Sequence, residues 1–234
     1  MDNYTVPLEW QSRTIKISVV GAGGTGSFVI AGLARIDNAI KELGHEYGLS
    51  VTAWDPDRVE RPNIGRQLFF EQDLGRNKAR VLINNVNLAY GLGWDAMPDK
   101  YQGHGFEDII ISCVDTKRAR RTIGRSLPQD AFIIDCGNER DFGQVIIGKL
   151  KDEALPSPYD EYPSLVAGGK EDNRASCSLM EALEGQELMI NQFVATYCLQ
   201  IIWEMLRYAK ISKRGYFINL SKGTTRSLKL NGQD

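Results

Sequence analysis

The chain has 234 residues, which is enough for one domain that buries most of its apolar surface. Hydrophobic residues make up 42% and charged residues 25%, so wholesale disorder, collagen-like repeats and a coiled coil are excluded. The net charge of −2 supplies no global field for holding nucleic acid, and we expect no direct nucleic-acid binding.

The start of the chain is acidic and polar with no apolar run behind it, which predicts no secretory signal and a cytoplasmic location. The four cysteines (Cys113, Cys136, Cys177 and Cys198) form no Cys-x-x-Cys pair, so we expect reduced thiols and no structural zinc. The apolar segment 188–206 carries a polar residue at every fourth position, which predicts a buried or interface helix and no membrane span.

The first part of the chain alternates expected strands with expected helices. The strands are 15–20, 49–55, 108–114 and 131–136, and the helices are 27–43, 75–90 and 116–125. Short connections imply right-handed crossovers and a parallel sheet with helices on both faces. We therefore predict a Rossmann-like α/β fold in a single domain, 1–234, whose nucleotide-binding core spans 14–148.

The second part of the chain follows a different pattern. A strand is expected at 142–150, and the stretch 151–176, rich in Pro, Gly and charge, is predicted to be a mobile crossover loop. A long helix at 186–209 and two strands at 216–220 and 226–230 complete the C-terminal segment, 177–234. These last strands predict antiparallel additions to the parallel sheet.

A glycine-rich turn between the first strand and the first helix carries the clearest motif. It reads Gly21-Ala22-Gly23-Gly24-Thr25-Gly26, and in this context backbone N–H groups and the helix dipole favour a phosphate. Asp55 ends the second strand, where an acid can accept hydrogen bonds from ribose hydroxyls. A dinucleotide dehydrogenase is compatible with both features.

The polar residues after Asp55 have no role in hydride transfer, and they are typical of ATP chemistry. Arg66 can fork onto phosphate oxygens, and Lys78 can add a compact positive charge at the same polyphosphate. Asp115 follows the strand 108–114, at the sheet edge where a carboxylate can hold Mg²⁺. Such a set stabilises charge on a triphosphate electrostatically.

In this order and spacing, the motifs resemble the ThiF/HesA/MoeB and ubiquitin-activating-enzyme superfamily. The shared signature comprises the glycine loop, Asp-x-Asp, Asn-x-x-Arg-Gln, Gly-x-x-Lys and a later strand-end Asp. The resemblance implies ATP-dependent adenylation of the C-terminal carboxylate of a ubiquitin-like protein. It also implies that Asp55 binds ribose, that Asp115 binds Mg²⁺, and that the phosphates are surrounded by Asp57, Asn63, Arg66, Gln67 and Lys78.

Segments 175–183, 190–192 and 215–220 resemble the ThiF-type member of the plasmid-associated PRTRC cassette. That resemblance implies two partners, a small ubiquitin-like protein and a conjugating-enzyme-like protein. We also expect a homodimer, both from the superfamily and from an apolar helix face containing Leu188, Phe193, Ile201 and Met205.

Two further functions stay open at this point. Relatives usually carry an Arg in a helix before the first strand, whereas here only Arg13 precedes it closely, which favours a nucleotide-binding scaffold without catalysis. A dehydrogenase is the third alternative.

Among the cysteines, Cys177 occupies a place like that of the reactive thiol of ThiF, and it is either a nucleophile or a packing residue. We expect Cys113, Cys136 and Cys198 to pack. Arg120 belongs to a basic run that is either a solvated helix face or part of the ATP site.

Overall fold

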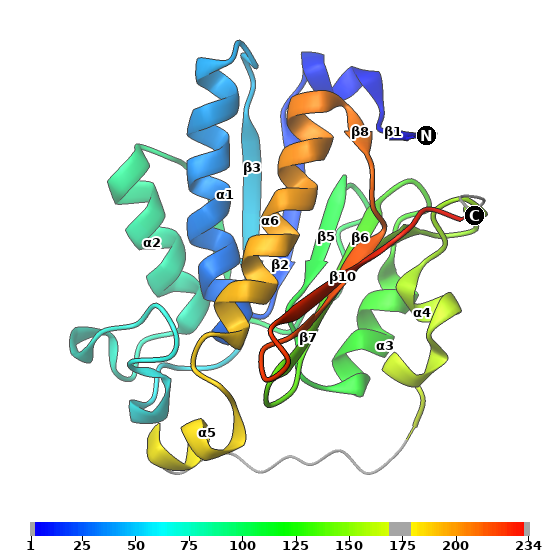
Figure 1. Cartoon of the computed structure of the whole chain (residues 1–234). Coiled ribbons are helices and arrows are strands. Elements are labelled where there is room, and N and C mark those ends of the chain that lie inside the picture. Colours follow the sequence, from blue (N-terminus) through cyan, green and yellow to red (C-terminus); the bar gives the residue numbers. More distant parts are fainter. Residues whose placement is uncertain (1–2, 169–178, 232–234) are drawn as a thin grey trace.

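A computed structural model describes residues 3–168 and 179–231, and an eight-stranded mixed sheet runs through them (Figure 1). The strand order is β10-β9-β7-β6-β5-β2-β3-β4. The five strands from β4 to β6 are parallel, whereas β7, β9 and β10 are antiparallel to their neighbours, which confirms the predicted fold class. The strand bounds are β2 (Ile15–Val20), β3 (Leu49–Trp54), β4 (Asp95–Met97), β5 (Ile109–Ser112), β6 (Phe132–Asn138), β7 (Phe142–Lys149), β9 (Gly215–Asn219) and β10 (Thr224–Leu228).

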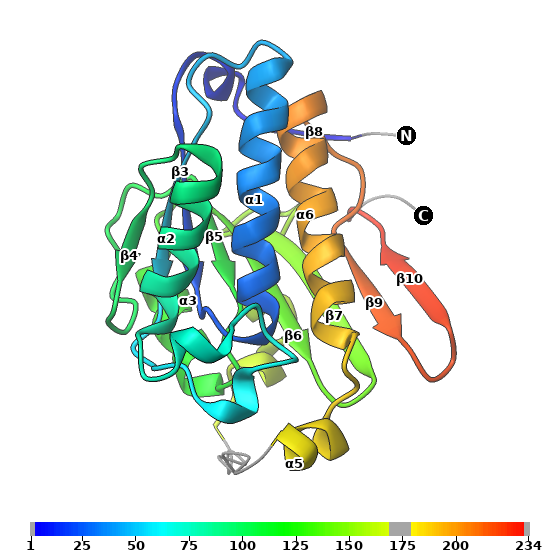
Figure 2. The same cartoon turned by 90° about the vertical axis from the view of Figure 1, so that its left-hand side faces the viewer.

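Helices cover the sheet on both faces. Three of them, α1 (Gly24–Glu42), α2 (Lys78–Tyr90) and α6 (Ile190–Tyr208), lie side by side on one face (Figure 2). On the other face lie α3 (Lys117–Ser126) and the short α4 (Pro158–Glu161), while α5 (Leu179–Gly185) precedes α6. A small second sheet pairs β1 (Tyr4–Thr5) with β8 (Lys210–Ile211). Short 3-10 helices occupy 8–12, 61–63, 71–73 and 163–165.

Local capping decides where two of these helices begin. The Asn77 side chain accepts a hydrogen bond from the Arg80 N–H at 3.0 Å, so α2 starts at Lys78 and not at the predicted residue 75. Thr116 caps α3 in the same way, accepting from the Ala119 N–H at 3.2 Å. Both caps place the first helical turn at the carboxyl end of a parallel strand.

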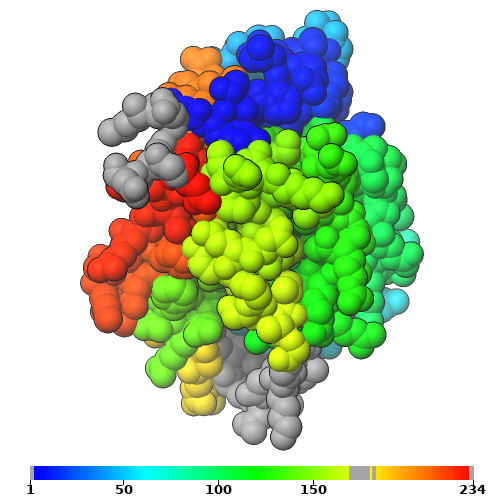
Figure 3. All heavy atoms as spheres, turned by 90° about the vertical axis from the view of Figure 1, so that its right-hand side faces the viewer, coloured from blue at the N-terminus to red at the C-terminus, as the bar shows by residue number. Residues whose placement is uncertain are grey.

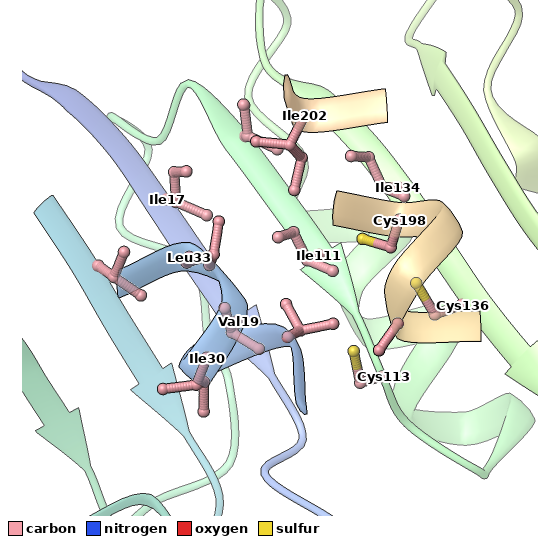
Figure 4. Close-up of a cluster of buried hydrophobic side chains, with 14 of the residues drawn as sticks. Ile17, Val19, Ile30, Leu33, Ile111, Cys113, Ile134, Cys136, Cys198 and Ile202 are labelled. Carbon is pink, nitrogen blue, oxygen red and sulfur yellow. The ribbon is translucent and has the colours of Figure 1, made fainter. Parts of the chain in front are cut away.

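The main core lies between the sheet and the layer formed by α1 and α6 (Figure 4). Isoleucine, leucine and valine side chains from β2, β5, β6 and α1 meet there, together with three thiols. Cys113, Cys136 and Cys198 are 9%, 2% and 0% exposed, which confirms that these cysteines pack. A hydrogen bond with Cys136, together with burial, raises the pKa of the Cys113 thiol well above its usual range. Cys113 is therefore a neutral packing group.

Helix α6 uses its apolar face inside the molecule. Of the face from which the dimer was expected, Ile201 and Met205 are 2% and 1% exposed and belong to the core, whereas Leu188 and Phe193 are 40% and 45% exposed. Gln192, Thr196 and Gln200 are exposed, as the polar stripe predicted. Within the described ranges, none of the helices is long and apolar enough to cross a membrane.

The first part of the predicted mobile loop is folded and anchored, so that prediction is wrong for residues 151–168. Ser157 caps α4, and Leu155 is fully buried. Arg214, 1% exposed, forms an ion pair with Glu161 and donates a hydrogen bond to Asn231 Oδ1 at 2.8 Å. A buried guanidinium needs such partners, and they hold this segment against the sheet. The rest of the predicted loop, 169–176, lies outside the described residues.

Candidate functional site

The predicted site residues gather at the carboxyl edge of the parallel strands, at the lower end of the molecule in Figure 1. Strands β2, β3 and β5 end there, and α1, α2 and α3 begin there. Ligands of open α/β sheets bind at this edge because the loops and the positive helix N-termini converge on it.

The glycine loop joins β2 to α1, and three of its four glycines leave no room for a Cβ. Gly21 has a φ of +94°, and a Cβ there would lie 2.6 Å from the Cys113 carbonyl oxygen. A Cβ on Gly26 would overlap the Gly21 carbonyl oxygen, and one on Gly24 would overlap Asn191 Oδ1. Nothing lies within 4 Å of the place where a Cβ on Gly23 would be. The loop is therefore tightly packed on its inner side and open at Gly23, the residue that caps α1.

Asp55 holds this loop in place. Its Oδ2 accepts a hydrogen bond from the Ala22 N–H at 2.7 Å, and its Oδ1 accepts one from the Asp57 N–H at 2.8 Å. The side chain is buried, and this burial raises the pKa of the carboxyl in spite of the two hydrogen bonds. The structure thus gives Asp55 a role in shaping the loop, and its contact with ribose stays a prediction.

Lys78 and Asp57 lie close together beside the loop. The Lys78 Nζ is 3.6 Å from Asp57 Oδ2, and only 12% of the Lys78 side chain is exposed, against 68% for Asp57. Asn77 fixes the connection by donating from Nδ2 to the Asp55 and Asp57 carbonyl oxygens at 2.8 and 3.0 Å. The cation is therefore partly desolvated and held at the start of α2.

The segment 63–67 brings polar atoms that are buried without partners. Asn63 closes a turn, because its Oδ1 accepts from the Glu60 N–H at 2.9 Å and its carbonyl oxygen accepts from the Gln67 N–H at 3.0 Å. Arg66 Nε and Gln67 Oε1 are buried and have no hydrogen-bond partner within the described part of the chain. Such orphaned groups are rare in folded proteins and indicate a missing ligand or water.

A polar network that the sequence analysis missed connects these segments. The Asn191 side chain, 3% exposed, accepts hydrogen bonds from Thr25 Oγ1 at 3.2 Å and Asn138 Nδ2 at 3.0 Å. It donates to Gln186 Oε1 at 2.9 Å, and the same oxygen accepts from Arg66 Nη1 at 2.8 Å. In the sequence, the one sign of this network is that Asn191 is a polar residue at the start of an apolar helix. In the sequence analysis, this residue served only as part of the resemblance.

Asp115 is suited to bind a metal ion together with the oxygens of a bound phosphate. It follows β5, its side chain is exposed, and its carboxylate makes no hydrogen bond or ion pair with another described residue. Within residues 3–168 and 179–231, no group of three or more His, Cys, Asp and Glu side chains could hold a metal ion. Mg²⁺ is commonly held by one or two carboxylates together with substrate phosphates and water, so Asp115 meets that requirement.

Three other candidates were also named from the sequence. Arg120 is 9% exposed and its Nε donates to Asp135 Oδ1 at 3.0 Å, so it is not a solvated helix residue. Arg13 forms a two-pronged pair with Asp108, at 2.7 and 2.6 Å, near the opposite edge of the sheet. Cys177 lies outside the described residues.

Comparisons with known proteins agree with this fold. The family model described as the ThiF family matches residues 9–234. The SUMO-activating enzyme subunit 2 of Dictyostelium discoideum is 29% identical over 160 residues, which cover 61% of this chain and 22% of that protein. This chain therefore matches less than a quarter of that relative's length.

Solved structures show the same architecture at low sequence identity. The crystal structure of PaaA superposes with a TM-score of 0.66 and 17% identity, covering 94% of this chain and 66% of that one. E. coli MccB with ATP gives a TM-score of 0.64 and 15% identity, with 94% of this chain and 65% of that one covered. This chain thus spans just under two thirds of each solved chain.

Proposed function

Because the chain belongs to the ThiF family, we propose that it is an adenylating enzyme, which uses ATP to activate the C-terminal carboxylate of a small ubiquitin-like protein. One observation carries the proposal. The buried, unpartnered polar atoms of Arg66 and Gln67 belong to the same sheet edge as the partly buried Lys78 and the open Gly23. These donors and acceptors are the groups that a nucleoside triphosphate would satisfy.

In the proposed reaction, an oxygen of the partner's carboxylate attacks the α-phosphorus of ATP and pyrophosphate leaves. Arg66 and Lys78 neutralise charge on the phosphate oxygens, and the N–H groups at the start of α1 add the helix dipole. Asp115 would hold Mg²⁺, which would supply further charge neutralisation when bound. Catalysis in this scheme is electrostatic and positional, since no side chain has to transfer a proton.

The relatives support the substrate class. One is a SUMO-activating enzyme subunit by name, and MccB was crystallised with ATP, so an ATP-dependent reaction on the C-terminus of a small protein suits the family. We further propose that the natural partners are a ubiquitin-like protein and a conjugating-enzyme-like protein of a PRTRC cassette. We also propose a homodimer, and light scattering that reports a monomer at micromolar concentration would overturn it.

The test is ATP–pyrophosphate exchange with and without candidate ubiquitin-like proteins. Asp115→Ala should slow exchange about a hundredfold, the cost of one lost transition-state contact of about 3 kcal/mol, while the fold stays intact. Asp130→Ala, an exposed acid beyond the far end of α3, should exchange normally. A normal rate for Asp115→Ala would show that the metal is held elsewhere. Calorimetry that finds tighter binding of NAD than of ATP with Mg²⁺ would favour a dehydrogenase.

A further inference from the structure

We propose that the outer edge of β10, with the sheet face beside it, binds an extended acidic segment of a protein partner, which adds to the sheet as a further strand. Charge is the first observation. Between residues 205 and 231 the sequence contains no Asp or Glu but has seven cations: Arg207, Lys210, Lys213, Arg214, Lys222, Arg226 and Lys229. Lys222 and Arg226 belong to the β9–β10 hairpin and Lys229 follows it, whereas the chain as a whole is slightly negative, so the hairpin is locally basic.

The charge of the hairpin itself is available to a partner. Arg214 is buried and paired with Glu161, whereas Lys222, Arg226 and Lys229 are exposed and form no ion pair with a described residue. Like charges repel a second copy of the same edge, which is how many proteins prevent edge strands from pairing with themselves. The charge therefore favours an acidic occupant over self-association.

The edge of β10 also offers free backbone groups. Strand β10 is the last strand of the sheet, and within the described residues no other strand pairs with its outer side. In an antiparallel strand, the backbone groups of alternate residues face the same neighbour. The Leu220 N–H donates to the carbonyl oxygen of Asp141, the residue before β7, at 2.8 Å. The backbone N–H and C=O groups of Ile218 and Tyr216 therefore also point toward β7.

The backbone N–H and C=O groups of the intervening β9 residues, Phe217 and Asn219, therefore point toward β10. Those of their partners Arg226 and Thr224 point toward β9. Leu228 agrees, because its carbonyl oxygen accepts from the Arg214 N–H at 2.9 Å. The N–H and C=O groups of Thr225 and Ser227 consequently point outward. These are the groups that an added strand would bond.

An aromatic pair lies on the sheet face next to this edge. The rings of Phe142 and Phe217 stack with their centroids 6.0 Å apart, both side chains are partly exposed, and Arg226 pairs with Phe217 across the strands. Side chains alternate along a strand, so Phe217 lies on the face opposite to the buried Ile218. In Figure 3 the hairpin forms the rim of the molecule beside the 150–168 segment. The rings offer apolar contact to a segment that also has acidic residues.

The hairpin is within reach of the candidate site. Five strand spacings separate β10 from β2, roughly 24 Å, which an extended tail of about seven residues spans. A partner docked at the hairpin could therefore place its C-terminus at the nucleotide site. Identifying that partner with the adenylation substrate rests on the proposed function, whereas docking itself does not.

The test uses the full chain without nucleotide and a labelled peptide of alternating Glu and Val, followed by fluorescence polarisation. We expect the acidic peptide to bind, a peptide with Lys in place of Glu not to bind, and affinity to fall as salt is raised. Arg226→Glu should weaken binding about tenfold, since it replaces an attraction by a repulsion, while the exposed Arg35→Glu on α1 should not.

Two edge variants test strand addition. Ser227→Pro removes an outward N–H without breaking a bond to β9, so it should weaken peptide binding, whereas Ser227→Ala should not. Hydrogen exchange should show slower exchange of the Thr225 and Ser227 amides only when the peptide is bound. Equal binding by Arg226→Glu and Ser227→Pro, or binding of a single-stranded oligonucleotide in place of the peptide, would overturn the inference. Asp115→Ala should lose pyrophosphate exchange and still bind the peptide, so the two proposals can fail separately.

Discussion

The Asn191 side chain connects the glycine loop, the end of β6 and Arg66, so its removal should damage both stability and catalysis. Asn191→Ala deletes three hydrogen bonds, to Thr25, Asn138 and Gln186, with donor–acceptor distances of 3.2, 3.0 and 2.9 Å. The residue is 3% exposed, so water cannot replace all of these bonds. The groups left behind are buried or partly buried and carry the cost of desolvation.

The expected loss of stability is about 2 to 3 kcal/mol, because each buried neutral hydrogen bond contributes roughly 1 kcal/mol and part of the cavity rehydrates. For a chain of this length, that corresponds to a fall in Tm of roughly 5 to 10 °C. Gln186 Oε1 would lose one of its two donors, and Arg66 would then be held less firmly. A looser Arg66 should slow ATP–pyrophosphate exchange at least about tenfold, since small misplacements of a positioning group are costly.

Thermal denaturation and pyrophosphate exchange are measured on Asn191→Ala and on Gln192→Ala, its exposed neighbour on the same helix. The control should match the wild type in both assays. An Asn191→Ala variant that melts and exchanges like Gln192→Ala would refute the network. A variant that loses stability but keeps its full exchange rate, measured well below its Tm, would show that the network is structural only and does not position Arg66.

Three further predictions concern the loop, a buried acid and the thiol. Gly26→Ala should lower the free energy of unfolding by about 2 kcal/mol and weaken ATP binding, because the added Cβ overlaps the Gly21 carbonyl, whereas Gly93→Ala meets nothing within 4 Å and should change neither in denaturation and calorimetry. Burial raises the pKa of Asp55, so the stability of the wild type relative to Asp55→Asn should fall as the pH rises above about 4, and urea denaturation showing the reverse trend would contradict this. Cys177→Ala should keep pyrophosphate exchange and lose any thiol-sensitive adduct with the ubiquitin-like protein, and an adduct that survives in mass spectrometry would rule out this nucleophile.

The sequence by itself was enough to predict the order of the helices and strands and the sheet edge that carries the glycine loop, because both depend on contiguous residues. The turn from Gly21 to Gly26 follows a β-rich run and opens a helix. Gly21 is required by the Cys113 carbonyl after the next parallel strand, and Gly26 is required by the Gly21 carbonyl of the motif itself. Hydrophobic runs with short connections leave few arrangements other than a parallel sheet. Asp115 was predicted to lie at this edge because a strand end is a local signal.

Tertiary structure alone decided which polar groups meet. Arg66 and Gln186 are 120 residues apart in the chain, and Asn191 and Thr25 are 166 apart, so no local period connects them. The same applies to Arg120, which looked like part of a solvated basic run until Asp135, from a strand, neutralised it inside the fold. The sequence shows that a charged or polar side chain will need a partner if it is buried, because desolvation without a hydrogen bond costs free energy. Which group becomes that partner depends on how distant segments pack together.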